Sequence, residues 1–104
     1  RYGDASIPMD EAIATCAIDV GGRSYAVIDL DLSSDRIGEL STQMIDHALE
    51  AFARTARVSV HLSASGRNDH HIAEAAFKAL ARALRSAIEP DPRRRGVAST
   101  KGAM

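Results

Sequence analysis

The stretch that decides the fold is "AIATCAIDVGGRSYAVIDLDL", residues 12–32, in which two alternating patterns flank a Gly-Gly pair. The apolar side chains of its first part are Ala12, Ala14, Cys16, Ile18 and Val20. A period of two places them on one face of a strand, while Thr15 and Asp19 point the other way. The apolar side chains of its second part are Ala26, Ile28, Leu30 and Leu32. Because two glycines can supply the positive φ angles of a tight turn, the sequence predicts a hairpin of two half-buried strands, residues 12–20 and 23–32.

An amphipathic helix is predicted after Ser41, a residue type that commonly caps helix N-termini. Its apolar stripe recurs at helical spacing and consists of Met44, Ile45, Ala48, Leu49 and Phe52. A weaker strand signal precedes it at residues 36–40. A short strand with Val58, Val60 and Leu62 follows it.

A second helix is predicted from about residue 70 to residue 88, after a polar loop at residues 63–69. Its apolar face consists of Ile72, Ala76, Phe77, Leu80, Leu84 and Ala87, and Pro90 and Pro92 end it. The element order is therefore β-β-β-α-β-α. This order predicts an α+β fold with both helices on one face of a four-stranded, largely antiparallel sheet.

The length and composition restrict the class of protein. The chain has 104 residues, is 45% hydrophobic and 26% charged, and fits one globular domain, residues 1–104, with an extended tail at 89–104. A net charge of -1 argues against a nucleic-acid-binding surface, and the Arg93–Arg95 run is short and lacks aromatic partners. The single Cys16 suits a reducing compartment, and no apolar run is long enough to span a membrane. The chain starts at Arg1 and not at Met, which indicates a fragment or a processed chain.

The polar face of the second helix carries most of the chemistry. At about 100 degrees per residue, His71, Glu74 and Lys78 fall on the side opposite the apolar stripe, followed by Arg82, while His70 points elsewhere. A solvated face with a routine Glu74–Lys78 ion pair is one interpretation, and it is favoured by the helix pattern alone. A second interpretation is that His70 only caps the helix.

The third interpretation is a metal site. Imidazole and carboxylate groups at i and i+3 suit divalent Mn, Fe or Zn, but two ligands do not close a site. His47 on the first helix lies off the apolar stripe and is a candidate further ligand, although an exposed helix histidine is equally expected. His61 alternates outward on its strand and is interpreted as a surface residue.

The tail "STKG", Ser99 to Gly102, offers a second kind of site. The hydroxyls of Ser99 and Thr100 and the amine of Lys101 can hold a phosphate through charge-assisted hydrogen bonds. The alternative is an unstructured chain end, which the sequence alone favours.

Segments spread over essentially the whole chain resemble the imidazoleglycerol-phosphate dehydratases, enzymes of histidine biosynthesis. These segments are "RYGDASIPMDEA" (1–12), "GRSY" (22–25), "IDHALEAFA" (45–53), "GRNDHHIAEAAFKALARAL" (66–84) and "DPRRRGVASTKG" (91–102). The resemblance covers only the second half of a duplicated pattern, in which each half has its own His-His-x-x-Glu motif. It implies a fold like ribosomal protein S5 domain 2, which agrees with the element order above.

The resemblance also implies roles for individual residues. His47, His70, His71 and Glu74 match manganese ligands of the second half, with Glu74 and His71 nearest the chemistry. The groups that match substrate binding, chiefly phosphate binding, are Arg1, Arg23, Lys78, Ser99 and Lys101.

The implied activity is that of a hydro-lyase that converts imidazoleglycerol phosphate to imidazole acetol phosphate with a pair of Mn²⁺ ions. The resemblance implies a cytoplasmic homo-oligomer of 24 subunits, without nucleic acid or membrane. Because the ligands of the first half are absent from these 104 residues, we expect one ion or none in this half alone. The missing half or another copy of the chain would be the partner. A metal-binding or self-assembling module without catalysis is the alternative function.

Overall fold

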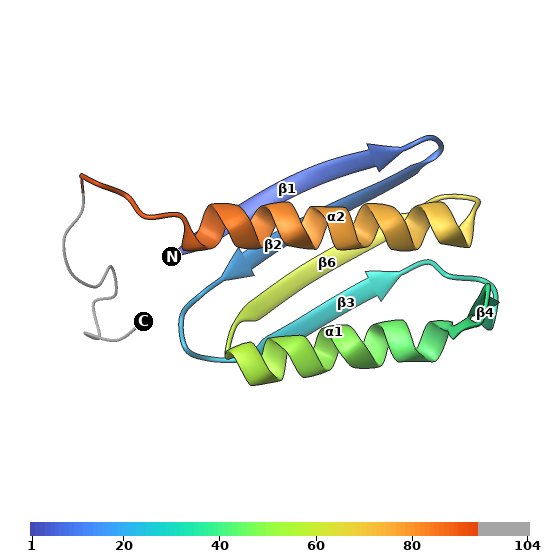
Figure 1. The fold of residues 1–104 in the computed structure, drawn as a ribbon, viewed down its shortest axis with the longest axis horizontal. Helices are drawn as coiled ribbons and strands as arrows, with labels where there is room; N and C mark the ends of the chain where they lie inside the picture. The colour runs from blue at the N-terminus through green and yellow to red at the C-terminus, as the bar shows by residue number, and fades with distance from the viewer. Residues whose placement is uncertain (94–104) are drawn as a thin grey trace.

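Four strands form a mixed sheet, and both helices lie across one of its faces (Figure 1). The computed structural model describes residues 1–93. The elements of the sheet are β1 (Tyr2–Met9), β2 (Ala12–Asp19), β3 (Tyr25–Leu30) and β6 (Ser59–Ser65), in the order β1-β2-β6-β3. The helices are α1 (Thr42–Ala56) and α2 (Asp69–Ile88). The predicted α+β class, with two helices on one face of four strands, is confirmed.

The predicted hairpin around Gly21-Gly22 is wrong, because β6 lies between β2 and β3. β2 pairs with both β1 and β6 in antiparallel fashion, and β3 pairs with β6 in parallel fashion, so the sheet is largely antiparallel, as predicted, with one parallel edge pair. The hairpin of the fold is β1–β2, which Asp10 and Glu11 connect. Asp10 takes the left-handed backbone conformation, with φ 51°, that such a tight connection requires.

The first strand of the sheet is residues 2–9, which the pattern did not predict. It is an edge strand whose inward side chains are only half-buried, and it tolerates Pro8 because an edge position leaves a backbone donor site unused. The predicted strand at 36–40 is instead a separate two-stranded ribbon of β4 (Arg36–Ile37) and β5 (Leu40–Ser41).

The core lies between the helices and the sheet. The predicted inward face of β2 is confirmed, since Ala12, Ala14, Cys16, Ile18 and Val20 are all buried. The predicted helix stripes need correction. Met44, Ala48 and Phe77 are exposed, as is Ala26 on β3. The buried face of α2 is made mostly of small residues instead: Ala75, Ala76, Ala79, Ala83 and Ala87, with Ile72. Alanines let the helix approach the sheet closely, which leaves the larger Leu80 and Leu84 half-buried at its sides.

Hydrogen bonds fix the start of α2 relative to the rest of the chain. The side chain of Asn68 caps the helix by accepting from the backbone N–H of His71 at 3.1 Å, so the interpretation of His70 as the cap is wrong. The Asp69 carboxylate accepts from the backbone N–H groups of Ser33 and Ser34, at 3.1 and 2.7 Å. Ser41 stands at the N-cap position of α1, but its side chain makes no capping hydrogen bond. Neither of the described helices is long and apolar enough to cross a membrane.

Candidate metal and substrate site

The start of α2 meets the β1–β2 turn, and this contact brings His71 against two carboxylates. His71 Nδ1 lies 2.6 Å from Glu11 Oε1. The other oxygen, Oε2 of Glu11, accepts from the backbone N–H groups of Arg67 and Asn68 at 2.8 and 3.0 Å. Asp10 Oδ2 lies 3.6 Å from His71 Nε2, which is beyond hydrogen-bond range. Two segments far apart in sequence therefore meet at one imidazole ring.

The pKa values of this pair follow from its hydrogen bonds. The hydrogen bond from His71 and that from the Arg67 backbone lower the pKa of Glu11 to about 2, so it is a carboxylate at neutral pH. The bond to Glu11 likewise raises the pKa of His71, against the opposing effect of desolvation.

Glu74 is the centre of a second set of contacts on the outer side of α2. Its Oε1 lies 3.3 Å from His70 Nε2, and its Oε2 accepts from Lys78 Nζ at 2.9 Å. The hydrogen bond from Lys78 is the largest cause of a lowered pKa of Glu74. The prediction that His71 converges with Glu74 and Lys78 is wrong about the histidine, because His70 is the one that contacts Glu74. The i,i+4 spacing joins residues 70, 74 and 78, while His71 turns to Glu11.

The two histidines diverge, as the helical wheel predicted. Their ring centroids are 6.3 Å apart with an angle of 89° between the ring planes. The side chain of His70 is 64% exposed and that of His71 is 26% exposed. One ring thus faces solvent beside Glu74, and the other is held at the turn between two strands.

The remaining predicted site residues lie elsewhere. His47 is exposed on α1, and within residues 1–93 no hydrogen bond or ion pair joins it to the histidines of α2. Arg1 and Arg23 lie at the end of the sheet opposite the start of α2. The backbone oxygen of Arg1 accepts from Val20 N–H, and that of Arg23 accepts from the Ser59 hydroxyl. Ser99, Thr100 and Lys101 fall outside the described residues.

The donor types at the start of α2 suit a divalent metal, but their number does not close a site. Imidazole nitrogens and a carboxylate are ligands that Mn²⁺, Fe²⁺ and Zn²⁺ accept. Over residues 1–93, no group of three or more His, Cys, Asp or Glu side chains is arranged to hold an ion. The start of α2 therefore offers donor types that a divalent ion accepts, without enclosing an ion within residues 1–93.

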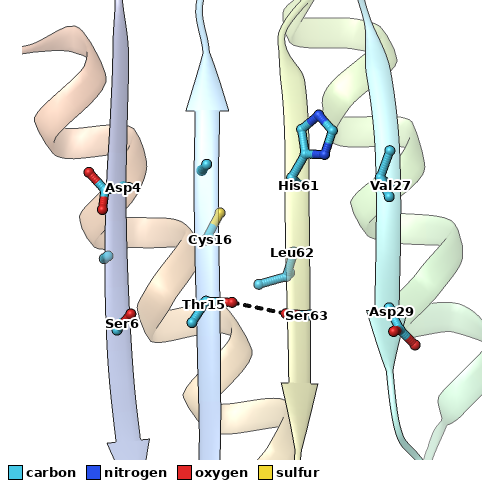
Figure 2. A pocket seen from close by; sticks show the side chains of 11 residues that line it. Asp4, Ser6, Thr15, Cys16, Val27, Asp29, His61, Leu62 and Ser63 are labelled. Carbon is cyan, nitrogen blue, oxygen red and sulfur yellow. Dashed lines mark hydrogen bonds between the residues drawn. The ribbon is translucent and has the colours of Figure 1, made fainter.

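The open face of the sheet has a shallow hollow of about 410 Å³ (Figure 2). Asp4, Asp29, His61 and the hydrogen-bonded pair Thr15 and Ser63, 2.9 Å apart, line it. Figure 2 shows the helices behind the strands, on the other side of the sheet. His61 is exposed on its strand as predicted, and none of the predicted site residues lies in this hollow.

Sequence reasoning missed Glu11 and Asp10. Both stand in a stretch whose strand, residues 2–9, was not predicted. A prediction of the β1–β2 hairpin would have placed the two carboxylates at a turn beside the end of the sheet. No periodicity links them to His71, which is 60 residues away from Glu11 along the chain.

Comparisons with known proteins point to one family. The family model described as imidazoleglycerol-phosphate dehydratase matches residues 1–84. An imidazoleglycerol-phosphate dehydratase of Methanoculleus marisnigri is 48% identical over 104 residues, which cover 100% of this chain and 54% of that protein. One of Clostridium botulinum (strain Okra / Type B1) is 46% identical over 105 residues, again 100% and 54%. The chain therefore spans about half the length of these curated relatives.

Solved structures agree with this comparison. The crystal structure of IGPD from Pyrococcus furiosus in complex with (S)-C348 has a TM-score of 0.86 and 36% identity, covering 100% of this chain and 57% of that one. The crystal structure of imidazoleglycerol-phosphate dehydratase from Staphylococcus aureus subsp. aureus N315 has a TM-score of 0.85 and 37% identity, covering 88% and 54%.

Proposed function

Because this chain belongs to the imidazoleglycerol-phosphate dehydratase family, we propose that it supplies one half of the active site of a manganese-dependent hydro-lyase. The reaction is the dehydration of imidazoleglycerol phosphate to imidazole acetol phosphate, a step of histidine biosynthesis in the cytoplasm. The observation that carries the proposal is the arrangement of two adjacent histidines at the start of α2, each beside its own carboxylate. His70 stands with Glu74 on one side, and His71 stands with Nε2 turned away from Glu11 on the other.

His47, His70, His71 and Glu74 are the proposed metal ligands. When bound, manganese would supply Lewis-acid stabilisation of the charge that develops as a proton leaves an unactivated carbon. Glu74 and His71 are the side chains proposed to stand nearest the reacting atoms. Glu74 can also relay a proton, since its carboxylate oxygens already lie within reach of two nitrogen donors, at 3.3 and 2.9 Å.

The phosphate of the substrate is proposed to meet cationic side chains. Lys78 stands one turn beyond Glu74, which holds its ammonium group at 2.9 Å and so orients it beside the metal ligands. Ser99, Thr100 and Lys101 supply hydroxyls and a further ammonium group. Arg1 and Arg23 lie at the end of the sheet opposite the start of α2, since their backbone oxygens accept from Val20 and Ser59, so we assign them to a site completed by a neighbouring copy.

The other half of the site must come from outside these residues. The chain matches 54% of the length of its curated relatives, and the described residues hold no closed metal cluster. We therefore propose a partner, either the first half of the family pattern or another copy of the chain, in a homo-oligomer that in the family has 24 subunits. The incomplete ligand set also favours a second candidate function, a metal-binding or self-assembling half without turnover.

Manganese titration tests the ligand assignment directly. Free Mn²⁺ is measured by electron paramagnetic resonance as it is added to the chain, to His71→Ala and to His61→Ala. His61 is a matched control because it is an exposed histidine on the sheet. We expect His71→Ala to weaken binding by more than about 10-fold, and His61→Ala to leave it unchanged. Equal binding by all three proteins would remove His71 from the site.

A further inference from the structure

We propose that Glu11 is a positioning residue for His71: it fixes the ring orientation and the tautomer, so that the Nε2 lone pair is the one presented to a ligand. The proposal rests on the proposed function only in naming that ligand as a divalent metal ion. Glu11 belongs to the β1–β2 turn and lies outside the His-His-x-x-Glu motif.

The two carboxylate oxygens of Glu11 contact different partners. Oε1 lies 2.6 Å from His71 Nδ1, and because an ionised carboxylate can only accept, Nδ1 must carry the proton. Oε2 accepts from the backbone N–H groups of Arg67 and Asn68, at 2.8 and 3.0 Å. One carboxylate thus holds both the ring and the loop that leads into α2.

The position of Glu11 is itself closely determined. The preceding Asp10 has φ 51°, which directs the turn back toward the sheet. A β-carbon built on Gly66 would lie 2.8 Å from Glu11 Oε2 and 2.8 Å from the β-carbon of Ala12. The turn and the loop therefore fit together only because residue 66 has no side chain, and this close fit leaves the Glu11 side chain 18% exposed.

This arrangement decides which nitrogen of His71 can bind a ligand. A neutral imidazole with its proton on Nδ1 has its lone pair on Nε2. Carboxylates that hold the outer nitrogen of a metal-ligating histidine fix the ring and strengthen it as a donor. Asp10 stands on the Nε2 side, with Oδ2 at 3.6 Å, so this nitrogen faces a second carboxylate.

Glu11→Gln separates positioning from a loss of packing, because it retains the size of the side chain. One oxygen becomes an NH₂ group. If the remaining oxygen keeps the two backbone bonds of the 67–68 loop, the NH₂ group faces His71 Nδ1. Nδ1 must then accept and the proton moves to Nε2, where it blocks a metal ion.

The test is the tautomer of His71, read from ring ¹H–¹⁵N correlations of the metal-free labelled chain at a pH where the ring is neutral. We expect the Nδ1–H form in the unaltered chain and a shift toward Nε2–H in Glu11→Gln. Glu89→Gln is the matched control, since Glu89 is exposed at the far end of α2. A wild-type ring protonated on Nε2 would overturn the proposal without any variant. An unchanged tautomer in Glu11→Gln would overturn it too.

Manganese affinity is the second measurement. We expect Glu11→Gln to bind Mn²⁺ about 10- to 100-fold more weakly than the unaltered chain and Glu89→Gln to bind as tightly as it does. Equal affinity in Glu11→Gln, together with a shifted tautomer, would overturn the link to the metal. If the unaltered chain alone binds no manganese, the affinities are compared with the other half of the family pattern added. No binding even then would contradict the proposed function, while the tautomer measurement still decides the role of Glu11.

Discussion

Gly3 of β1 lies directly under Ala83 of α2, so closely that a β-carbon built on Gly3 would stand 2.5 Å from the carbonyl oxygen of Ala83. The same atom would lie 2.6 Å from the backbone nitrogen of Ala87. Both neighbours are backbone atoms of a helix, which cannot turn aside as a flexible side chain can. This contact sets how near α2 approaches the sheet, and hence where its histidines stand relative to the β1–β2 turn.

Gly3→Ala is expected to lower the free energy of unfolding by about 1–3 kcal/mol, because the helix must move away from an edge strand. Urea denaturation measures the loss. Gly21→Ala is the matched control, since its nearest contact would be a side-chain atom of Asp19 at 3.3 Å and its backbone is not in the left-handed region. We expect the control to change stability by less than about 0.5 kcal/mol. Equal stability of the two variants would contradict the close approach.

Asp69→Ala is expected to cost about 1–2 kcal/mol, since it removes an acceptor from two backbone N–H groups and a negative charge from a helix N-terminus. The backbone bonds from Ser33 and Ser34 lower the pKa of Asp69. The contribution of Asp69 to the free energy of unfolding is therefore fully present at pH values above the ordinary pKa of a carboxyl group. It is lost as the pH falls through the lowered pKa of the folded state. Asp46→Ala on the exposed face of α1 is the control. Identical acid unfolding curves for Asp69→Ala and the unaltered chain would contradict this assignment.

Cys16 is expected to resist thiol reagents in the folded chain. Burial raises its pKa from 9.0 to about 11, which leaves roughly 100-fold less thiolate at a given pH than in an unfolded chain. The sign of the pH effect follows from proton binding. Between about pH 9 and pH 11 the unfolded chain loses a proton that the folded chain keeps, so stability falls as the pH rises. Titration with a chromogenic disulfide, with and without urea, measures this. Equal reaction rates in both solutions would show that Cys16 is not buried.

The parts of the fold that periodicity predicted are those in which one face is buried in a regular way. Apolar and polar residues alternate along β2 because the helices cover one face of this strand. Apolar residues recur at helical spacing in α1 and α2 because one face of each helix is buried. β1 was not predicted because it is an edge strand: its inward side chains are only half-buried, so apolar and polar residues alternate weakly, and it contains a proline. The pairing of β3 with β6 was not predictable from local signals. Parallel strands need a crossover connection, here through α1, and the sequence of neither strand specifies where that connection ends.

The site was predictable only within one helix. Spacing indicated that Glu74 and Lys78 lie together on the outer side of α2, but it placed His71 with them, whereas His70 is the histidine beside Glu74. The partner of His71 could not be found by spacing, because Glu11 is brought to it by a hairpin and a loop that meet only in the folded chain. The resemblance named the ligand candidates but not the carboxylate that orients one of them.

The central claim is that this chain holds half of a dehydratase site and needs the other half for turnover. The direct measurement is dehydration of imidazoleglycerol phosphate with Mn²⁺ by the chain alone, and by the chain together with a separately produced piece of the Methanoculleus marisnigri relative. That piece is the part of the relative outside the 54% that matches this chain at 48% identity. We expect turnover only in the mixture, and its loss when the chain has His71→Ala. Turnover by the chain alone at the rate of the mixture, or no turnover by a mixture that forms a complex in sedimentation, would contradict the claim.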